Sequence, residues 1–345
     1  MKSFLFTLPI LLLAFSCANQ TENSSSTLEG KADQYSIRIA VGSCNKVDQI
    51  NVFWDDIAEQ HPEAFVWSGD IVYADSDDIR VIQAEYNKQK EIKAYAELSE
   101  QTQIFGTWDD HDYGKNDGGQ EFELKEESQQ ALLDFLDVPQ ENDRRAQEGV
   151  YTSHILENDY GTVELLMLDT RYFRSSLVPD TENGRRYKAN TDTSTTLLGE
   201  KQWMWLEEKI ENSQANFLVI VSSIQLLSNQ HQFEKWENLP HEREKMIALI
   251  KRFADKNIFV VSGDRHISEF SSMPIGAQKQ LIDFTSSGLT HSYSSFSGEP
   301  NPFRVKEVVS DPSYGIIDFN LKENLVHAYM MGDDKEVQQE LKVNY

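Results

Sequence analysis

The chain has little positive charge for its size. Its 345 residues include 32 lysines and arginines against 57 aspartates and glutamates, which gives a net charge of −25. An acidic excess of this size would repel nucleic acids and anionic lipid headgroups, so neither is expected as a partner. Most of the acidic side chains are expected to lie on a solvated surface. Hydrophobic residues make up 39% of the chain, enough for one large core or two small ones.

Long hydrophobic runs are missing, apart from one at the N-terminus. There, residues 4–15 are mostly apolar, follow one lysine and lead into Ser16 and Cys17. Such a run is too short for a permanent membrane span, so residues 1–17 are predicted to be a lipoprotein signal peptide with Cys17 as the lipidated residue. An ordinary secretory signal or an uncleaved anchor would also fit. Residues 18–34 are polar and predict a flexible tether before a domain at residues 35–345.

Cysteine is scarce. The chain has two, Cys17 and Cys44, and lipidation of Cys17 would leave Cys44 without a disulfide partner. A lone thiol in an exported protein is either a small buried core residue or a metal ligand. Cys44 directly follows a Gly-Ser pair at the end of an apolar run, and this position favours the metal ligand.

Several common catalytic motifs are absent. The sequence contains no G-x-S-x-G, no G-x-x-x-x-G-K-[ST] and no H-E-x-x-H pattern. Residues 112–119, DYGKNDGG, superficially resemble a calcium loop, but their carboxylate spacing does not fit the EF-hand. The serines of SSIQ (222–225) and TSSG (285–288) have no activating neighbour in the sequence. These absences argue against the serine-hydrolase, phosphate-loop and zinc-protease classes.

Short apolar runs alternate with amphipathic segments from about residue 35 onwards. The runs have strand length and are rich in Val, Ile, Phe and Tyr, which is typical of strands covered on both faces. Residues 128–138, 198–212 and 241–257 space their apolar side chains at helical intervals, with Ser128 a possible cap. This alternation predicts a layered α/β domain. The predicted strands lie in residues 36–44, 64–70, 103–110, 162–171, 217–225, 258–266, 281–288, 314–320 and 324–331.

Polar residues directly follow six of these apolar runs. Ligand sites of open α/β sheets form at the carboxyl ends of the strands, so these six tips are predicted to converge on one site. The tips are GSC, SGD, WDDHD, LDTR, SSIQ and SGDRH, and they carry Cys44, Asp70, Asp109, Asp110, His111, Asp112, Asp264 and His266.

Bound cations would explain why so many carboxylates end these strands. Two carboxylates about 4 Å apart repel by roughly 4 kcal/mol at an effective dielectric near 20, whereas a typical folding free energy is about 5–15 kcal/mol. Carboxylates favour hard cations, and thiolate and imidazole favour transition metals, so the mixture predicts two unlike metals side by side. Two metals about 3.5–4 Å apart suit the attack of a metal-bound hydroxide on phosphorus.

The motifs also resemble those of a known family. VGSC (41–44), WSGDIVYAD (67–75), GTWDDHDYGKNDGG (106–119), LLMLDTRYFR (165–174) and VSGDRH (261–266) occur in that family's order. In these motifs the chain resembles the PhoD-like (alkaline phosphatase D) family of metallophosphatases, within the calcineurin-like metallophosphoesterase superfamily. The similarity extends over about residues 36–290. It implies a four-layer αββα sandwich in a single domain and hydrolysis of phosphate esters.

The resemblance further implies a binuclear centre of iron with calcium and a role for several residues. His111 is similar to a histidine that protonates the leaving alkoxide, and Asp110 to a carboxylate that orients this histidine. Asp70 resembles the carboxylate that bridges the two metals, and Tyr73 competes with Tyr86 for the place of a tyrosine that ligates the iron. The metal ligands implied are Cys44, Asp70, Tyr73, Asn116, Asp264 and His266.

Arg171 is a further candidate for the catalytic site. It ends the run LLMLDTR, where its guanidinium could hold a substrate phosphate through two hydrogen bonds. An ion pair with Asp169 or its neighbours is an equally good interpretation. Arg265 could also contact phosphate, on a weaker argument.

The sequence therefore predicts an exported, lipid-anchored monomer in a bacterial cell envelope, either in the periplasm or at the cell surface. Its expected partner is a small phosphate ester, and its only membrane contact is the expected lipid anchor. Two other functions fit the sequence. One is a phosphodiesterase or phospholipase with little monoesterase activity, and the other is a non-catalytic surface lipoprotein that binds calcium.

Overall fold

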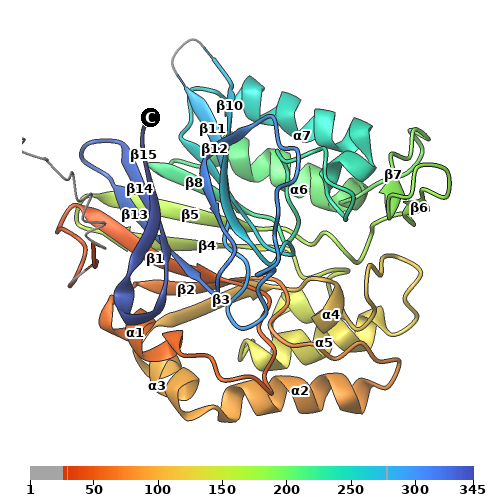
Figure 1. The fold of residues 1–345 in the computed structure, drawn as a ribbon, viewed down its shortest axis with the longest axis horizontal. Helices are drawn as coiled ribbons and strands as arrows, with labels where there is room; N and C mark the ends of the chain where they lie inside the picture. The colour runs from red at the N-terminus through yellow and green to blue at the C-terminus, as the bar shows by residue number, and fades with distance from the viewer. Residues whose placement is uncertain (1–25, 29, 277–278) are drawn as a thin grey trace, which may run out of the picture.

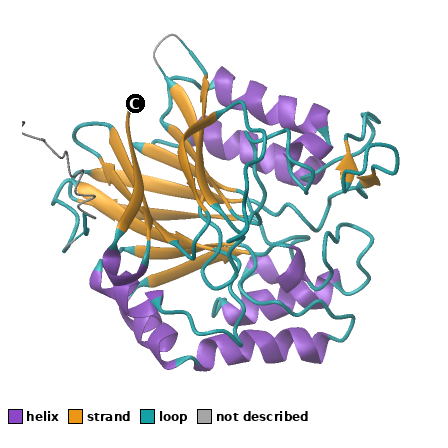
Figure 2. Cartoon of the chain, viewed as in Figure 1, coloured by secondary structure: helices purple, strands orange, loops and turns teal. Residues whose placement is uncertain are grey.

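Two β-sheets packed face to face form the centre of the molecule, with helices on both outer sides (Figures 1 and 2). The computed structural model describes residues 26–28, 30–276 and 279–345. One sheet has six strands in the order β15-β14-β13-β1-β2-β3, and the other has seven in the order β12-β10-β11-β9-β8-β5-β4. This arrangement confirms the predicted four-layer αββα sandwich.

The strands of the six-stranded sheet are β1 (Ser36–Gly42), β2 (Ala64–Ser68), β3 (Gln103–Thr107), β13 (Tyr314–Asn320), β14 (Leu325–Met331) and β15 (Val337–Asn344). Those of the seven-stranded sheet are β4 (Thr152–Asn158), β5 (Gly161–Met167), β8 (Phe217–Val221), β9 (Ile258–Ser262), β10 (Ser268–Pro274), β11 (Gln280–Thr285) and β12 (Arg304–Val309). A separate hairpin pairs β6 (Val178–Pro179) with β7 (Tyr187–Lys188). Pairing is parallel within β1-β2-β3 and within β5-β8-β9-β11.

Two groups of helices cover the outer faces of the sheets. The six-stranded sheet packs on α1 (Phe53–Glu59), α2 (Ile79–Glu91), α3 (Lys93–Gln101) and α5 (Lys125–Phe135), whereas α6 (Gly199–Asn212) and α7 (Pro240–Arg252) cover the seven-stranded sheet. A short helix, α4 (Asp110–Tyr113), follows β3. Among the described residues, no helix has the length and apolar character needed to cross a membrane.

Alternation of side chains along the central strands builds three apolar layers. In β2, Ala64 and Val66 point into the core between the two sheets, whereas Phe65 and Trp67 pack against the helices outside. Trp67 meets Trp54 of α1 with ring centroids 5.6 Å apart. Because successive residues of a strand face opposite sides, a strand buried on both faces is apolar throughout. The predicted double coverage of these runs is confirmed.

The structure corrects the expected start of one helix. Ser128 was a possible cap, but α5 begins at Lys125, and Ser128 lies buried in its second turn. The nine expected runs all contain strands, whereas β4, β10, β12 and β15 were not predicted. These four strands carry many polar residues, as in TSHILEN of β4 and VQQELKVN of β15, so they lack a continuous apolar signal.

Part of the expected tether lies against the domain. Val337 N donates to Ser26 O at 2.8 Å, and Leu28 N donates to Lys335 O at 3.2 Å, beside the start of β15. Arg38 Nη1 donates to Gly30 O at 2.6 Å. The expected signal peptide and Cys17 lie outside the described residues.

His154 on β4 couples folding to pH. Its ring stacks on Phe105, with centroids 3.9 Å apart, and burial, together with Arg144, lowers the pKa of His154 to about 4. An unfolded histidine titrates at about 6.5, so between these values the unfolded chain binds the proton more tightly. This difference removes up to about 3 kcal/mol of stability as the pH falls from about 6.5 to about 4.

We expect His154→Phe, which keeps the stacked ring and removes the titration, to lose about 2–3 kcal/mol less stability than the wild type between pH 7.5 and 4.5. Urea unfolding at the two pH values measures this difference, because other titrating groups cancel between the proteins. The control is His61→Asn, which replaces an exposed histidine at a residue with positive φ. Equal pH dependence in the wild type and His154→Phe would contradict the prediction.

Candidate active site

The carboxyl ends of the parallel strands meet at one edge of the sandwich, as predicted. Cys44, Asp70, Asp109 and Asp264 each lie two residues beyond a strand, namely β1, β2, β3 and β9. Cys44, Asp70, Asp264 and His266 adopt the left-handed conformation, with φ of 57°, 51°, 66° and 57°. This conformation is uncommon for residues with a Cβ, and it persists where the surrounding structure enforces it, often at functional sites.

Two glycines allow the strand tips to approach each other. A Cβ at Gly69 would lie 2.5 Å from Asp109 Cβ, and one at Gly263 would lie 2.5 Å from Ser68 O. Both distances are far inside van der Waals contact. Glycine is therefore required next to Asp70 and next to Asp264 for the two sheets to bring their carboxylates together.

The first cluster combines thiol, carboxylate, imidazole and phenol. Cys44, Asp70 and His266 each offer a ligand atom, and these three atoms lie within 4.8 Å of one another. Tyr73 Oη lies 3.1 Å from His266 Nε2 and donates to Asp70 Oδ2 at 3.3 Å. Tyr86, the competing tyrosine, donates to Asp112 O at 3.5 Å from the buried face of α2. The geometry therefore supports Tyr73.

Two further groups of possible ligands adjoin this cluster. They are Asp70 with Asp110 and His111, and Asp109 with Asp110 and Asp264. Asn116 is also close, since its Nδ2 donates to Asp110 Oδ2 at 2.9 Å. Asp70 belongs to two of the three groups, so one carboxylate connects the thiol side of the site to the aspartate side.

The donor set fits a pair of cations. Asp264 Oδ2 and Asp109 Oδ2 are buried and have no hydrogen-bond partner among the described residues. Burial raises the pKa of Asp70 and of Asp264 well above the ordinary carboxyl value, and neighbouring negative groups raise it further. A cation bound between them would replace the missing solvation and restore the ionised form.

The nitrogen and sulfur ligands fit the same interpretation. Burial raises the pKa of Cys44 to about 11, so its thiolate needs a positive partner at Sγ. Burial, together with His291 and Arg265, lowers the pKa of His266 to about 3. The imidazole of His266 is therefore neutral near pH 7, which is the form that binds metals.

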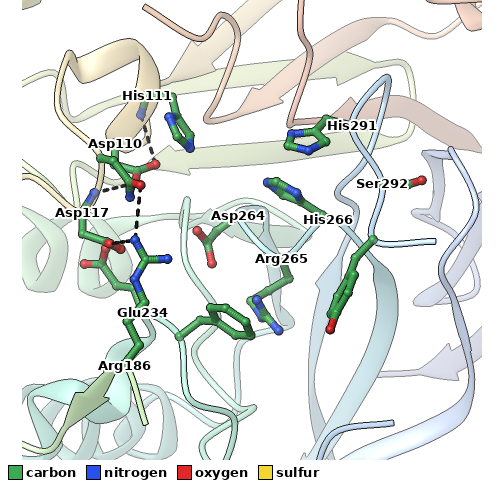
Figure 3. Close-up of a pocket in the computed structure, with 13 residues that line it drawn as sticks. Asp110, His111, Asp117, Arg186, Glu234, Asp264, Arg265, His266, His291 and Ser292 are labelled. Atoms are coloured by element: carbon green, nitrogen blue, oxygen red, sulfur yellow. Dashed lines mark hydrogen bonds and ion pairs between the residues drawn. The ribbon is translucent and has the colours of Figure 1, made fainter. Parts of the chain in front are cut away.

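Asp75, which the sequence analysis assigned no role, contacts the imidazole of His111. His111 Nδ1 lies 2.8 and 2.7 Å from the two carboxylate oxygens of Asp75. Asp110 instead accepts from the backbone of His111, at 3.0 Å, and from the 116–117 turn (Figure 3). Asp110 therefore fixes the backbone of the loop, and its expected role in orienting the imidazole stays a prediction.

Neighbouring charges shift the pKa values of both Asp110 and His111. Burial alone would raise the pKa of Asp110, but Arg171, His111 and the turn hydrogen bonds lower it to about 2. Burial would lower the pKa of His111, but Asp70, Asp75 and Asp110 outweigh it and raise the pKa to about 10.

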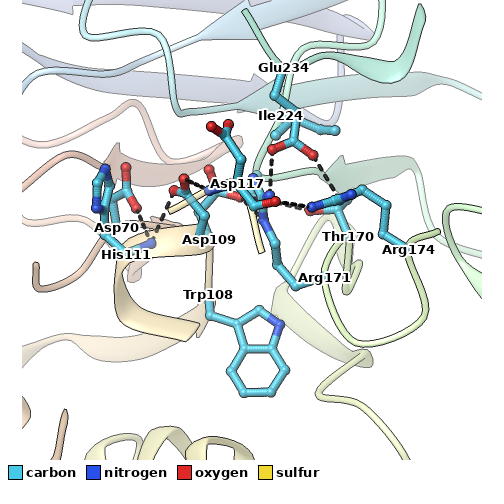
Figure 4. Close-up of polar contacts among 12 residues, drawn as sticks. Asp70, Trp108, Asp109, His111, Asp117, Thr170, Arg171, Arg174, Ile224 and Glu234 are labelled. Carbon is cyan, nitrogen blue, oxygen red and sulfur yellow. Dashed lines mark hydrogen bonds and ion pairs between the residues drawn. The ribbon is translucent and has the colours of Figure 1, made fainter. Parts of the chain in front are cut away.

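The side chain of Arg171 lies buried in the protein interior. Its Nε donates to Asp109 Oδ1 at 2.6 Å and its Nη1 to Glu234 Oε2 at 2.5 Å, while Arg174 Nε lies 2.9 Å from Glu234 Oε1 (Figure 4). The side chain of Arg171 is 0% exposed. The expected phosphate clamp is therefore wrong for this placement, and the ion pair forms with Asp109 rather than Asp169. Breaking such a buried pair typically costs about 3–5 kcal/mol.

A cavity of about 380 Å³ opens above the clusters (Figure 3). His111, Asn116, Asp264 and His266 line it, as expected for ligands or catalytic groups facing a substrate. Its wall also contains residues for which the sequence predicted no role: Arg186, Phe233, Glu234, His291 and Tyr293. The ring of His291 lies 4.2 Å from that of His266. Only the position of His291 near a predicted strand tip could have indicated this.

Comparison with known proteins agrees with the fold and the motifs. A model of the PhoD-like phosphatase family matches residues 39–327. Alkaline phosphatase D of Bacillus subtilis (strain 168) is 23% identical over 256 residues, which are 68% of this chain and 44% of that protein. The chain thus matches less than half the length of this curated relative.

Two solved structures share the fold. The structure of PhoD superposes with a TM-score of 0.71 at 16% identity, over 92% of this chain and 70% of that one. GAP50, described as the anchor in the inner membrane complex of Plasmodium, superposes with a TM-score of 0.60 at 14% identity, over 90% and 89% of the two chains. At these identities the likeness extends to the fold alone.

Proposed function

Since the chain belongs to the PhoD-like phosphatase family, a family of phosphoric ester hydrolases, we propose that it hydrolyses small phosphate esters at this metal centre. The observation that carries the proposal is the gathering of ligand atoms of Cys44, Asp70 and His266 within 4.8 Å of one another, beside a cavity that His266 lines. The residues proposed to hold the metals are Cys44, Asp70, Tyr73, Asn116, Asp264 and His266. Iron with calcium is the proposed pair, because the donors include both soft and hard ligands.

When bound, such a metal pair supplies a water of lowered pKa and positive charge opposite the phosphate oxygens. The chain itself supplies the geometry. Asp70 belongs to two of the groups of ligands, Asp264 lines the cavity, and both residues adopt the left-handed backbone conformation. Arg171 neutralises the carboxylate of Asp109, so metals are needed to balance only part of the acidic charge of the site.

His111 is the proposed proton donor to the leaving alcohol. The carboxylate of Asp75 accepts from Nδ1, which leaves Nε2 as the nitrogen available to the substrate in the cavity. The ring of His111 stacks on Tyr73, with centroids 4.1 Å apart, and this contact fixes its plane. Asp75 is therefore the positioning residue for His111.

Asp70→Asn and His266→Ala are each expected to lower aryl phosphate hydrolysis by at least about 10³-fold, because each removes a proposed ligand of the metal pair. The measurements are turnover of an aryl phosphate and metal content by mass spectrometry. The control is His327→Asn on β14, whose imidazole pairs with Glu340 at 2.6 Å outside the cavity. Near wild-type turnover in either ligand variant would refute the mechanism, and full metal content without turnover in the wild type would support the non-catalytic binding protein.

His111→Asn and Asp75→Asn are expected to slow hydrolysis more for an alkyl phosphate than for a nitrophenyl phosphate. Assistance by an acid is worth about 10²–10⁴-fold when the leaving alcohol is a poor one, and much less when it is a good one. The ratio of kcat values on the two esters measures this difference, and circular dichroism checks the fold. An equal loss on both esters would show that His111 does not act on the leaving group.

The competing enzymatic function is a phosphodiesterase or phospholipase with little monoesterase activity. The volume of the cavity does not distinguish a phosphomonoester substrate from a phosphodiester substrate. Paired kcat/KM values on a mono- and a diester of the same aryl alcohol separate the two functions.

We further propose that the protein is exported and anchored through lipid on Cys17 in a bacterial cell envelope. Support comes from residues 1–17, with a short apolar run ending at Ser16 and Cys17. Cys17→Ser is expected to move the protein from the membrane fraction to the soluble fraction and to abolish labelling with a radioactive fatty acid. Unchanged fractionation and labelling would contradict lipidation at Cys17.

A further inference from the structure

The cavity poses an electrostatic problem for a phosphate. Four of the residues that line it are carboxylates: Asp110, Asp117, Glu234 and Asp264. A phosphomonoester carries about two negative charges near neutral pH, so a cation in addition to the metals and His111 would favour its binding at the entrance. Among the described residues that line the cavity, the arginines are Arg186 and Arg265.

These two arginines differ in how free their guanidinium groups are. The side chain of Arg265 is 5% exposed, pairs with Glu299 at 2.6 Å and lies over the ring of Phe233 at 4.5 Å. The side chain of Arg186 is 43% exposed and pairs with Asp117. Of these two arginines, Arg186 therefore has the more exposed side chain on the cavity wall.

The hairpin that carries Arg186 is tied to the loop of the proposed ligand Asn116. Arg186 Nη2 donates to Asn116 Oδ1 at 3.2 Å, and Tyr187 Oη donates to Asp117 Oδ2 at 2.7 Å. On the other side, Tyr187 N donates to Gln232 O at 3.3 Å. These contacts place the guanidinium at the edge of the proposed metal site, beside Asn116, whereas Cys44 is fully buried.

We propose that Arg186 binds the terminal oxygens of the substrate phosphate and makes phosphomonoesters the preferred substrates. A monoester has three terminal oxygens and about two negative charges, so it offers an arginine more acceptor atoms and more charge than a diester does. A diester has only two terminal oxygens and one negative charge, so it gains less from this side chain. The proposal rests on the proposed function and names the substrate class of the same site.

Arg186→Ala is expected to lower kcat/KM for an aryl phosphomonoester by about 10–100-fold, mainly through KM, and for the matching bis-aryl diester by less than about threefold. Arg186→Lys should restore part of the monoester rate, because it keeps the charge but not the fork. Arg185→Ala is the matched control, since it removes the neighbouring exposed arginine, which does not line the cavity. Tyr187→Phe removes the hydroxyl that donates to the carboxylate of Asp117. This variant tests whether anchoring of the 116–117 loop is by itself responsible for the effect.

An equal loss on both esters in Arg186→Ala, or the same loss in Tyr187→Phe, would overturn the proposal and leave Arg186 an anchor of the loop. Binding of inorganic phosphate to the purified, metal-loaded protein, measured by calorimetry, gives a second test. Phosphate should bind at least tenfold more weakly to Arg186→Ala than to the wild type. If the wild type hydrolyses neither ester, the proposed function fails by itself, and unchanged phosphate binding in Arg186→Ala would then refute the role of Arg186 separately.

Discussion

Mutual repulsion among buried carboxylates is the constraint on which this structure depends. The protein neutralises one side of the acidic cluster itself, since Arg171 joins Asp109 to Glu234, and Arg174 completes the network. Within the described part of the chain, no lysine or arginine forms an ion pair with Asp70 or Asp264, and burial raises the pKa of both. The site is thus divided into a part that the chain balances and a part that it leaves to bound ions, which is the physical basis of the proposed chemistry.

The sandwich fold makes this concentration of charge possible. Parallel strands of two sheets end at the same edge, and Gly69 and Gly263 let these ends approach more closely than side chains would permit. The left-handed backbone at Cys44, Asp70, Asp264 and His266 then turns each side chain inward. Folding free energy from the three apolar layers outweighs the cost of this strain, because the layers surround the strands on every face.

Much of this site could be predicted because parallel-sheet geometry alone determines where strand tips meet. Cys44, Asp70 and His266 form one group for that reason, and Asp264 lies with Asp109 and Asp110 in an adjoining one. The side chain of Arg171 could not be placed, since the sequence does not say whether a cation at a tip faces the cavity or the interior. Asp75 was missed because it reaches His111 across 36 residues, whereas Asp110 is the sequence neighbour. The polar strand β4 and the cap at Ser128 show the same limit, where packing overrides a local signal.

The β6-β7 hairpin lies outside both sheets, in the connection between β5 and α6, yet it contributes to the cavity wall (Figure 1). Substitutions in such an excursion that keep its contacts with Asn116 and Asp117 leave the buried layers and the strand tips in place. Natural variation can therefore reshape what enters the cavity while the hydrolytic apparatus stays constant. Members of one family with this architecture are free to differ in substrate preference while they share a single reaction.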